Sequence, residues 1–192
     1  MKFKLLLVLL LCSTVLFSQE DKLKLHSISF TPVGIYFDDS SSGVFISSDI
    51  GFSRGKHIFK IFGLGASEVS ILSGTTESFF ELSLIYGREF RIEKWFYIDA
   101  YAGGGYFKYK LTKGVDSEGF FTYSSYDDSV NHTIGLHLQS RLRFQTGKYF
   151  SLGLQANTNI NPQNSIYNLA VFLQWKFKNS KSTKPKIKEN SN

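Results

Sequence analysis

The chain of 192 residues has one cysteine, three prolines and, after residue 17, no long run of apolar residues. Without a second run of about 18 apolar residues, the sequence predicts no transmembrane helix beyond the N-terminus. The scarcity of proline and the lack of a glycine period exclude a collagen-like fibre, and 42% hydrophobic residues are too many for a disordered chain. The four histidines lack the spacing of metal ligands, so we expect no metal site and no cofactor; they are His26, His57, His132 and His137.

Residues 1–19 are predicted to form a secretory signal peptide. Lys2 and Lys4 precede an apolar run over residues 5–17, and small and polar residues follow it. The run is shorter than the roughly 20 residues of a permanent transmembrane helix. A signal anchor is one alternative and lipidation of Cys12 another, although a leucine stands where a small residue should precede a lipidated cysteine. Since Cys12 lies inside the signal, the exported chain would have no thiol for disulfides, catalysis or metal binding.

The basic character of the chain lies at its two ends. The formal net charge is +6, but Lys2 and Lys4 belong to the predicted signal, and residues 178–192 contain five lysines and one glutamate. The segment between them is therefore close to neutral, which argues against a nucleic-acid groove on the folded part. Residues 179–192 are expected to form a disordered basic tail in the periplasm; alternatively, its lysines touch anionic peptidoglycan or lipid headgroups.

Apolar and polar residues alternate with a period of two along most of the remaining chain, which is typical of β-strands. In residues 132–145, for example, Leu136, Leu138 and Leu142 share one face, and Arg141 and Arg143 share the other. Pro32 interrupts the first strand and predicts a bulge or a shorter strand there. We expect eight strands, in residues 25–37, 44–53, 57–71, 78–89, 95–110, 132–145, 150–157 and 167–177.

Strand length and connection length indicate a membrane barrel. Most of these segments have about ten residues or more, whereas strands of globular proteins usually have 5–6. Short turns at residues 54–56, 91–94 and 146–148 alternate with longer polar connections, as in outer-membrane barrels. The sequence therefore predicts an all-β fold, an eight-stranded antiparallel up-and-down transmembrane β-barrel over residues 20–178 with both ends in the periplasm. Aromatic residues are expected in two belts: Trp95, Phe96, Tyr149, Trp175 and Phe177 at the inner rim, and Tyr36, Phe79, Tyr106, Tyr109 and Tyr167 at the outer rim.

The polar faces of the strands predict a charged lumen. An eight-stranded barrel is just wide enough for its own side chains, so we expect these charges to pair with one another and to leave no conducting pore. The predicted lumen polar network consists of Asp49, Glu81, Glu89, Asp99, His137, Arg141, Arg143 and Lys176.

Three short stretches resemble a known family. Residues 95–106 (WFYIDAYAGGGY) resemble the glycine- and aromatic-rich central strand of small outer-membrane β-barrel proteins, the eight-stranded type related to the transmembrane domain of outer membrane protein A. The signal ending at residues 17–19 is similar to those of Bacteroidota members, and residues 173–177 (LQWKF) resemble their closing strand. The resemblance implies that Leu173, Trp175 and Phe177 form the signal read by the barrel assembly machinery. The tail beyond Phe177 departs from members that stop at the final aromatic residue.

The longest connection, residues 112–131, combines aromatic and acidic residues and has two interpretations. One is an exposed contact surface for an extracellular ligand or another surface, carried by Phe120, Phe121, Tyr123 and Tyr126. The other is a hairpin formed by two extended strand tips whose aromatic residues contact each other.

These features favour a structural or adhesive outer-membrane protein without enzymatic activity, whose partners are outer-membrane lipid and the assembly machinery. One alternative is a soluble lipocalin-like barrel that binds a small apolar ligand; its faces would be inverted, with Arg141 and Arg143 outside. Another is a lipid-modifying enzyme, for which the one candidate catalytic cluster is His132 near Ser129 and Asp128.

Overall fold

The computed structural model describes residues 23–38, 41–68, 75–115 and 125–177. The predicted signal peptide, the basic tail over residues 179–192, and Phe120, Phe121 and Tyr123 lie outside these ranges. Within them, no helix has the length and apolar character needed to cross a bilayer.

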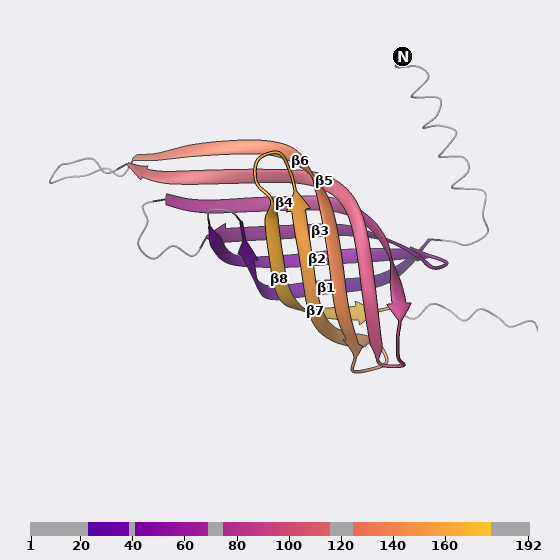
Figure 1. Cartoon of the computed structure of the whole chain (residues 1–192). Coiled ribbons are helices and arrows are strands. Elements are labelled where there is room, and N and C mark those ends of the chain that lie inside the picture. Colours follow the sequence, from indigo (N-terminus) through magenta and orange to yellow (C-terminus); the bar gives the residue numbers. More distant parts are fainter. Residues whose placement is uncertain (1–22, 39–40, 69–74, 116–124, 178–192) are drawn as a thin grey trace, which may run out of the picture.

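Eight antiparallel strands form a closed barrel in which β1 pairs with both β2 and β8 (Figure 1). The strands are β1 (Lys24–Phe37), β2 (Ser42–Arg54), β3 (His57–Glu68), β4 (Thr75–Arg91), β5 (Phe96–Val115), β6 (Ser125–Gln145), β7 (Phe150–Ile160) and β8 (Ile166–Lys176). The prediction of an eight-stranded antiparallel up-and-down barrel is confirmed. We call the end with the β2–β3, β4–β5 and β6–β7 connections the turn end, and the opposite end the loop end.

Alternation along each strand places apolar side chains outside and polar side chains inside. Leu84 and Ile134 on the outer surface are 69% and 78% exposed, whereas Arg141 and Arg143 in the lumen are 1% and 0% exposed. A water-soluble ligand-binding barrel would need the opposite arrangement, so the lipocalin-like alternative is wrong about which face carries the charges.

Pro32 coincides with a bulge, as expected. The registers of β1 with β2 and with β8 both shift between residues 30 and 34, because proline has no N–H to donate to a ladder. Gly34 follows directly, and a Cβ atom there would overlap the ring of Phe45 inside the barrel. The bulge therefore allows the backbone of β1 to approach the lumen closely.

Strands β5 and β6 are the two longest described strands, and β6, with 21 residues, is much longer than its neighbour β7, with 11. They pair with each other as far as Val115 and Ser125, whereas the pairing of β6 with β7 ends at Leu136 and Ile160 (Figure 1). Residues 112–115 and 125–131, expected to belong to a connection, are therefore strand, and their pairing agrees with the hairpin interpretation. The expected contact between its aromatic residues lies outside the described side chains. We call residues 106–115 and 125–135 the β5–β6 extension.

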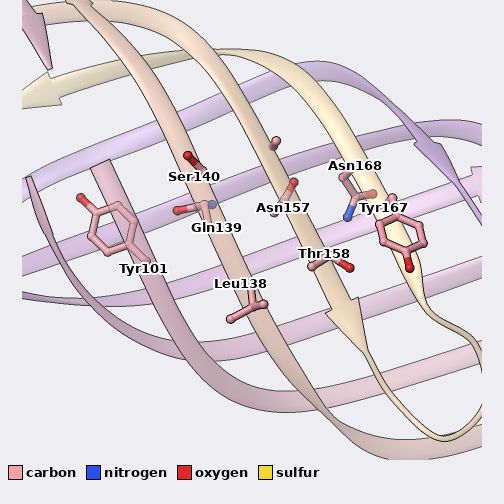
Figure 2. A pocket seen from close by; sticks show the side chains of 9 residues that line it. Tyr101, Leu138, Gln139, Ser140, Asn157, Thr158, Tyr167 and Asn168 are labelled. Atoms are coloured by element: carbon pink, nitrogen blue, oxygen red, sulfur yellow. The ribbon is translucent and has the colours of Figure 1, made fainter. Parts of the chain in front are cut away.

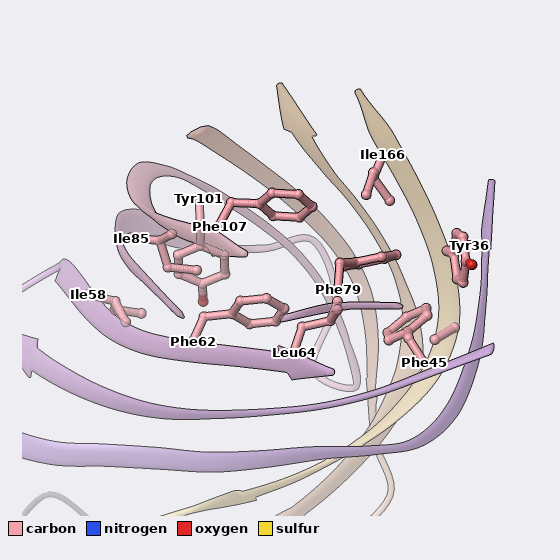
Figure 3. Packing of buried hydrophobic residues seen from close by; sticks show 11 residues of the cluster. Tyr36, Phe45, Ile58, Phe62, Leu64, Phe79, Ile85, Tyr101, Phe107 and Ile166 are labelled. Carbon is pink, nitrogen blue, oxygen red and sulfur yellow. The ribbon is translucent and has the colours of Figure 1, made fainter. Parts of the chain in front are cut away.

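The half of the lumen near the loop end is filled by apolar side chains. Figure 3 shows rings from β1 to β5, one from each strand, converging there: Tyr36, Phe45, Phe62, Phe79 and Phe107. Tyr36 and Phe79 are buried, and Tyr109 packs against the same cluster. The expectation that these last three belong to an outer aromatic belt is wrong, because their positions in the alternation point them inward. We call this cluster the apolar plug.

Two adjacent glycines in β5 provide a test of inward packing. A Cβ atom on Gly103 would lie 2.7 Å from the Cα atom of Ile85 and would overlap the carbonyl oxygen of Leu84, whereas one on Gly104 would meet only a carbonyl oxygen at 3.4 Å. We expect Gly103→Val to lower the free energy of unfolding by about 1–3 kcal/mol through overpacking. Gly104→Val should change it little. Urea titration of the barrel in lipid vesicles measures both, and equal losses would contradict this packing.

Candidate functional site

The half of the lumen near the turn end contains a charged cluster centred on Asp49 of β2. The Asp49 carboxylate accepts hydrogen bonds from the Arg141 guanidinium and, at 3.2 Å, from Ser29 Oγ. It also lies 3.3 Å from Lys60 Nζ. Arg141 comes from β6 and donates from Nε to Gln155 Oε1 at 3.2 Å. This cluster connects β1, β2, β3, β6 and β7 across the lumen.

A second cluster lies next to the first, around Glu89 and Asp99. Arg143 donates two hydrogen bonds to Asp99, from Nε at 2.9 Å and from Nη2 at 3.0 Å. The same guanidinium lies 2.9 Å from Glu89 Oε2. Glu89 also contacts Lys176 of β8 and, at 3.0 Å, His26 Nε2 of β1. A single carboxylate at the turn end thus engages three cationic or basic groups.

The third group lies at the base of the apolar plug. His137 Nδ1 is 2.6 Å from Glu81 Oε1, and Ser83 Oγ donates to the same oxygen at 2.5 Å. The imidazole packs against the Phe62 ring with centroids 4.5 Å apart. This pair therefore lies at the boundary between the apolar and the charged halves of the lumen.

The three clusters bring together all eight residues that the sequence assigned to the lumen. They also include Lys60 and His26, which the sequence reasoning left out. Lys60 Nζ lies 3.9 Å from the Tyr101 ring centroid and next to Asp49. Four cations pair with three carboxylates: Lys60, Arg141, Arg143 and Lys176 with Asp49, Glu89 and Asp99. The fourth carboxylate, Glu81, pairs with His137.

Balanced, hydrogen-bonded charges of this kind stabilise a fixed arrangement of strands and leave each group with a partner. In the described part of the chain, no group of three His, Cys, Asp or Glu side chains is positioned to hold a metal ion. The arrangement is suited to cross-linking the barrel walls, and the apolar plug closes the lumen above it.

The wall made by β6, β7 and β8 has a dent in its outer surface, a cavity of about 370 Å³ (Figure 2). Small side chains at Ser140 and Ala156 create it, and Leu138 and Tyr167 border it. On the lumen side of the same wall, Gln139 and Asn157 are buried and have side-chain atoms without a protein hydrogen-bond partner. Such groups need water, so this side of the lumen is suited to hydration.

His132, the one histidine considered for catalysis, lies on the outer surface of the β5–β6 extension. Its Nδ1 is 2.5 Å from the Tyr106 hydroxyl, and the two rings stack with centroids 5.8 Å apart. Ser129 is three residues away on the same strand and therefore projects from the opposite face. The strand geometry does not bring this hydroxyl to the imidazole.

The residues assigned to assembly and to surface contact have different positions. Leu173, Trp175 and Phe177 all face outward at the end of β8, and the Trp175 ring packs edge-on against Phe150 at 5.1 Å. Tyr126 lies in β6 opposite Gly114, within the β5–β6 extension.

Comparisons with known proteins agree with this architecture. No protein-family model matches the chain, and no curated protein matches it significantly. Among solved structures, neisserial surface protein A is similar with a TM-score of 0.57 at 11% identity, over 82% of this chain and 100% of that one. The attachment invasion locus protein Ail of Yersinia pestis gives 0.48 at 15% identity, over 82% of this chain and 99% of Ail.

A third similar structure is the N-terminal β-barrel domain of Pseudomonas aeruginosa OprF, with a TM-score of 0.47 at 9% identity, over 80% of this chain and 100% of that domain. At these identities the likeness concerns the fold, and the match to neisserial surface protein A carries it. The chain therefore has the fold of the small eight-stranded transmembrane β-barrels.

Proposed function

We propose that the chain is an outer-membrane barrel with a structural or adhesive role, which presents the β5–β6 extension outside the cell as its contact surface. The continuation of β6 beyond its last pairing with β7 carries this proposal. A barrel whose role is confined to the membrane would not need strands that extend beyond the lipid, so the extension points to a role outside the bilayer.

The outer surface of the barrel supports a membrane location. On β8 the outward residues run from Tyr167 to Phe177, and Trp175 and Phe177 end the apolar stretch at the turn end. Ten residues that rise about 3.3 Å each and tilt by about 40° span about 25 Å, the height of the apolar band on outer-membrane barrels. The connections at the turn end, opposite the extension, are short. Outer-membrane barrels have their short turns in the periplasm, which supports an orientation with the turn end on that side.

The extension has the physical properties of a recognition element. Among the described residues, no strand pairs with the outer edge of β6 over residues 125–135, so its backbone groups are available to a partner. Val130 and His132 are exposed on it. We include Phe120, Phe121, Tyr123 and Tyr126 in the proposed contact surface, because aromatic side chains contribute strongly to recognition. The extracellular ligand or surface would bind there.

The closing strand supports the proposed assembly route. Leu173, Trp175 and Phe177 face the lipid side of β8, and β8 is the strand that closes the barrel against β1. We propose that the barrel assembly machinery reads these three side chains before closure buries the edge of the strand.

Shortening the extension tests the proposal. In the test variant an Asn-Gly turn replaces residues 113–127, joining the paired positions Thr112 and Asp128. Cells that display this variant should lose adhesion to other bacterial cells, while the protein stays in the membrane fraction and keeps a heat-dependent shift in gel mobility. The control replaces the β7–β8 connection, residues 161–165, by the same turn.

Unchanged adhesion of the shortened chain, or adhesion lost equally in the control, would contradict the assigned contact surface. Recovery of the full-length protein in the soluble fraction, without any mobility shift, would contradict the membrane location itself.

A further inference from the structure

The wall of the barrel has a notch at the turn end, between the β2–β3 turn and the end of β4. Pairing of β3 with β4 ends at Ile58 and Gly87, but β4 continues to Arg91 while paired with β5. Gly55, with φ of 61°, reverses the chain in the tight turn that leaves this edge uncovered. In the described part of the chain, no strand pairs with that edge of β4 over residues 88–91. The notch holds a cavity of about 710 Å³.

The notch carries an excess of positive charge. Lys56, Arg88 and Arg91 line it and are exposed. Its one lining carboxylate, Glu89, already contacts His26, Arg143 and Lys176. Arg91 donates from Nε to the carbonyl oxygen of Glu93 at 3.3 Å, and Glu93 is not among the residues that line the cavity. Within the described ranges, these three cations therefore face the cavity without a carboxylate partner.

One wall of the notch belongs to the lipid-facing surface. Alternation along β4 puts Arg88 between Tyr86 and Phe90 on the outward face, and Phe90 is 51% exposed. Tyr86 is held there by His57, whose Nδ1 lies 2.5 Å from the tyrosine hydroxyl. An arginine between two aromatic residues at the edge of the apolar band extends its guanidinium toward the level of lipid headgroups.

We propose that this notch binds the phosphate of an anionic phospholipid in the adjoining leaflet, with Lys56, Arg88 and Arg91 around the headgroup, Phe90 beside it, and the acyl chains along Tyr86. The inference rests on the proposed membrane location. Basic pockets next to an apolar surface are typical sites for anionic headgroups. A free phosphate would use the cations alone, whereas a lipid also covers the exposed aromatic wall, which favours the lipid as occupant.

Native mass spectrometry of the full chain, extracted from membranes in detergent, tests the site with phosphatidylglycerol and phosphatidylcholine as probes. The wild type should bind phosphatidylglycerol at least about tenfold more tightly than phosphatidylcholine. The variant Lys56→Gln, Arg88→Gln, Arg91→Gln should lose this preference. The matched control removes the same charge from exposed lysines elsewhere at the turn end and should retain it: Lys24→Gln, Lys94→Gln, Lys148→Gln.

Equal loss in the control would assign the preference to the general charge of the rim and overturn the site. Displacement of phosphatidylglycerol by an equal concentration of inorganic phosphate, which has no acyl chains, would overturn the lipid as occupant. Heat-dependent mobility confirms that each variant is folded, and Lys56→Gln with Arg91→Gln, both in or next to turns, replaces the triple variant if that one does not fold. A folded, membrane-extracted chain without lipid preference overturns this inference alone, whereas a chain in the soluble fraction overturns the proposed function.

Discussion

Asp49→Asn is expected to lower the free energy of unfolding by about 3–5 kcal/mol, the usual cost of leaving a buried charge without its counter-ion. Among the residues that the structure describes, Asp49 is the only carboxylate that contacts Lys60 and Arg141, which are both buried in the lumen. Its neutral amide would leave two adjacent cations facing each other across β3 and β6. Urea titration of the barrel folded in phospholipid vesicles measures the loss.

Glu93→Gln is the control for this substitution, because Glu93 is exposed in the β4–β5 turn and its neutralisation should cost less than about 0.5 kcal/mol. Adding Lys60→Met to Asp49→Asn should recover part of the stability, since one of the two unpaired cations is then gone. If Asp49→Asn and Glu93→Gln have the same effect, the lumen cluster does not contribute the stability assigned to it.

Leu138→Arg is expected to lower the free energy of unfolding by about 2–4 kcal/mol, the cost of a cation at the middle of the lipid-facing surface. Leu138 is 38% exposed, faces outward from β6, and lies midway between Ile134 and Phe144 at the two ends of its apolar stretch. The arginine could not reach either headgroup layer without bending the side chain along the barrel. The same vesicle titration, with the heat-dependent mobility shift as a second measurement, gives the result.

Val130→Arg is the matched control, because Val130 faces outward from the same strand but lies in the β5–β6 extension and is 41% exposed. In water an arginine at this position should change stability by less than about 0.5 kcal/mol. Equal losses at the two positions, or no loss at Leu138, would contradict a lipid-facing surface at this height.

The period-two pattern was sufficient to predict the barrel and the faces of most strands. In β6, leucines at alternate positions face outward and the two arginines face inward, as the sequence indicates. The reason is physical: where one face of a strand meets lipid and the other a polar lumen, the two faces differ strongly in composition.

The pattern was insufficient where both faces are apolar. In β3, Ile58, Phe62 and Leu64 point into the lumen while Phe59 and Ile61 point outward, so the sequence gives no contrast that would assign Lys60 to a face. The inward positions of Tyr36 and Phe79 were missed for the same reason. The aromatic content was attributed to interface belts, although part of it forms the apolar plug.

The length of the β5–β6 extension could not be derived from composition. Residues 112–115 and 125–131 are rich in polar residues at both alternating sets of positions, as expected of strand beyond the apolar band. Alternation of hydrophobicity therefore ends where the lipid ends, and backbone pairing continues beyond it. Sequence periodicity depends on the solvent that each face of a strand contacts, and it does not indicate how far the backbone hydrogen bonds continue.

The contacts of Arg141 have a consequence for the order of folding. This side chain on β6 meets Asp49 on β2 and Ser29 on β1, residues 92 and 112 positions earlier in the chain. Contacts at such separations form late, because the intervening loop must first be closed. Interactions absent from the folding transition state chiefly slow unfolding. We therefore expect the cross-lumen cluster to lower the unfolding rate of the barrel and to have little influence on its folding rate.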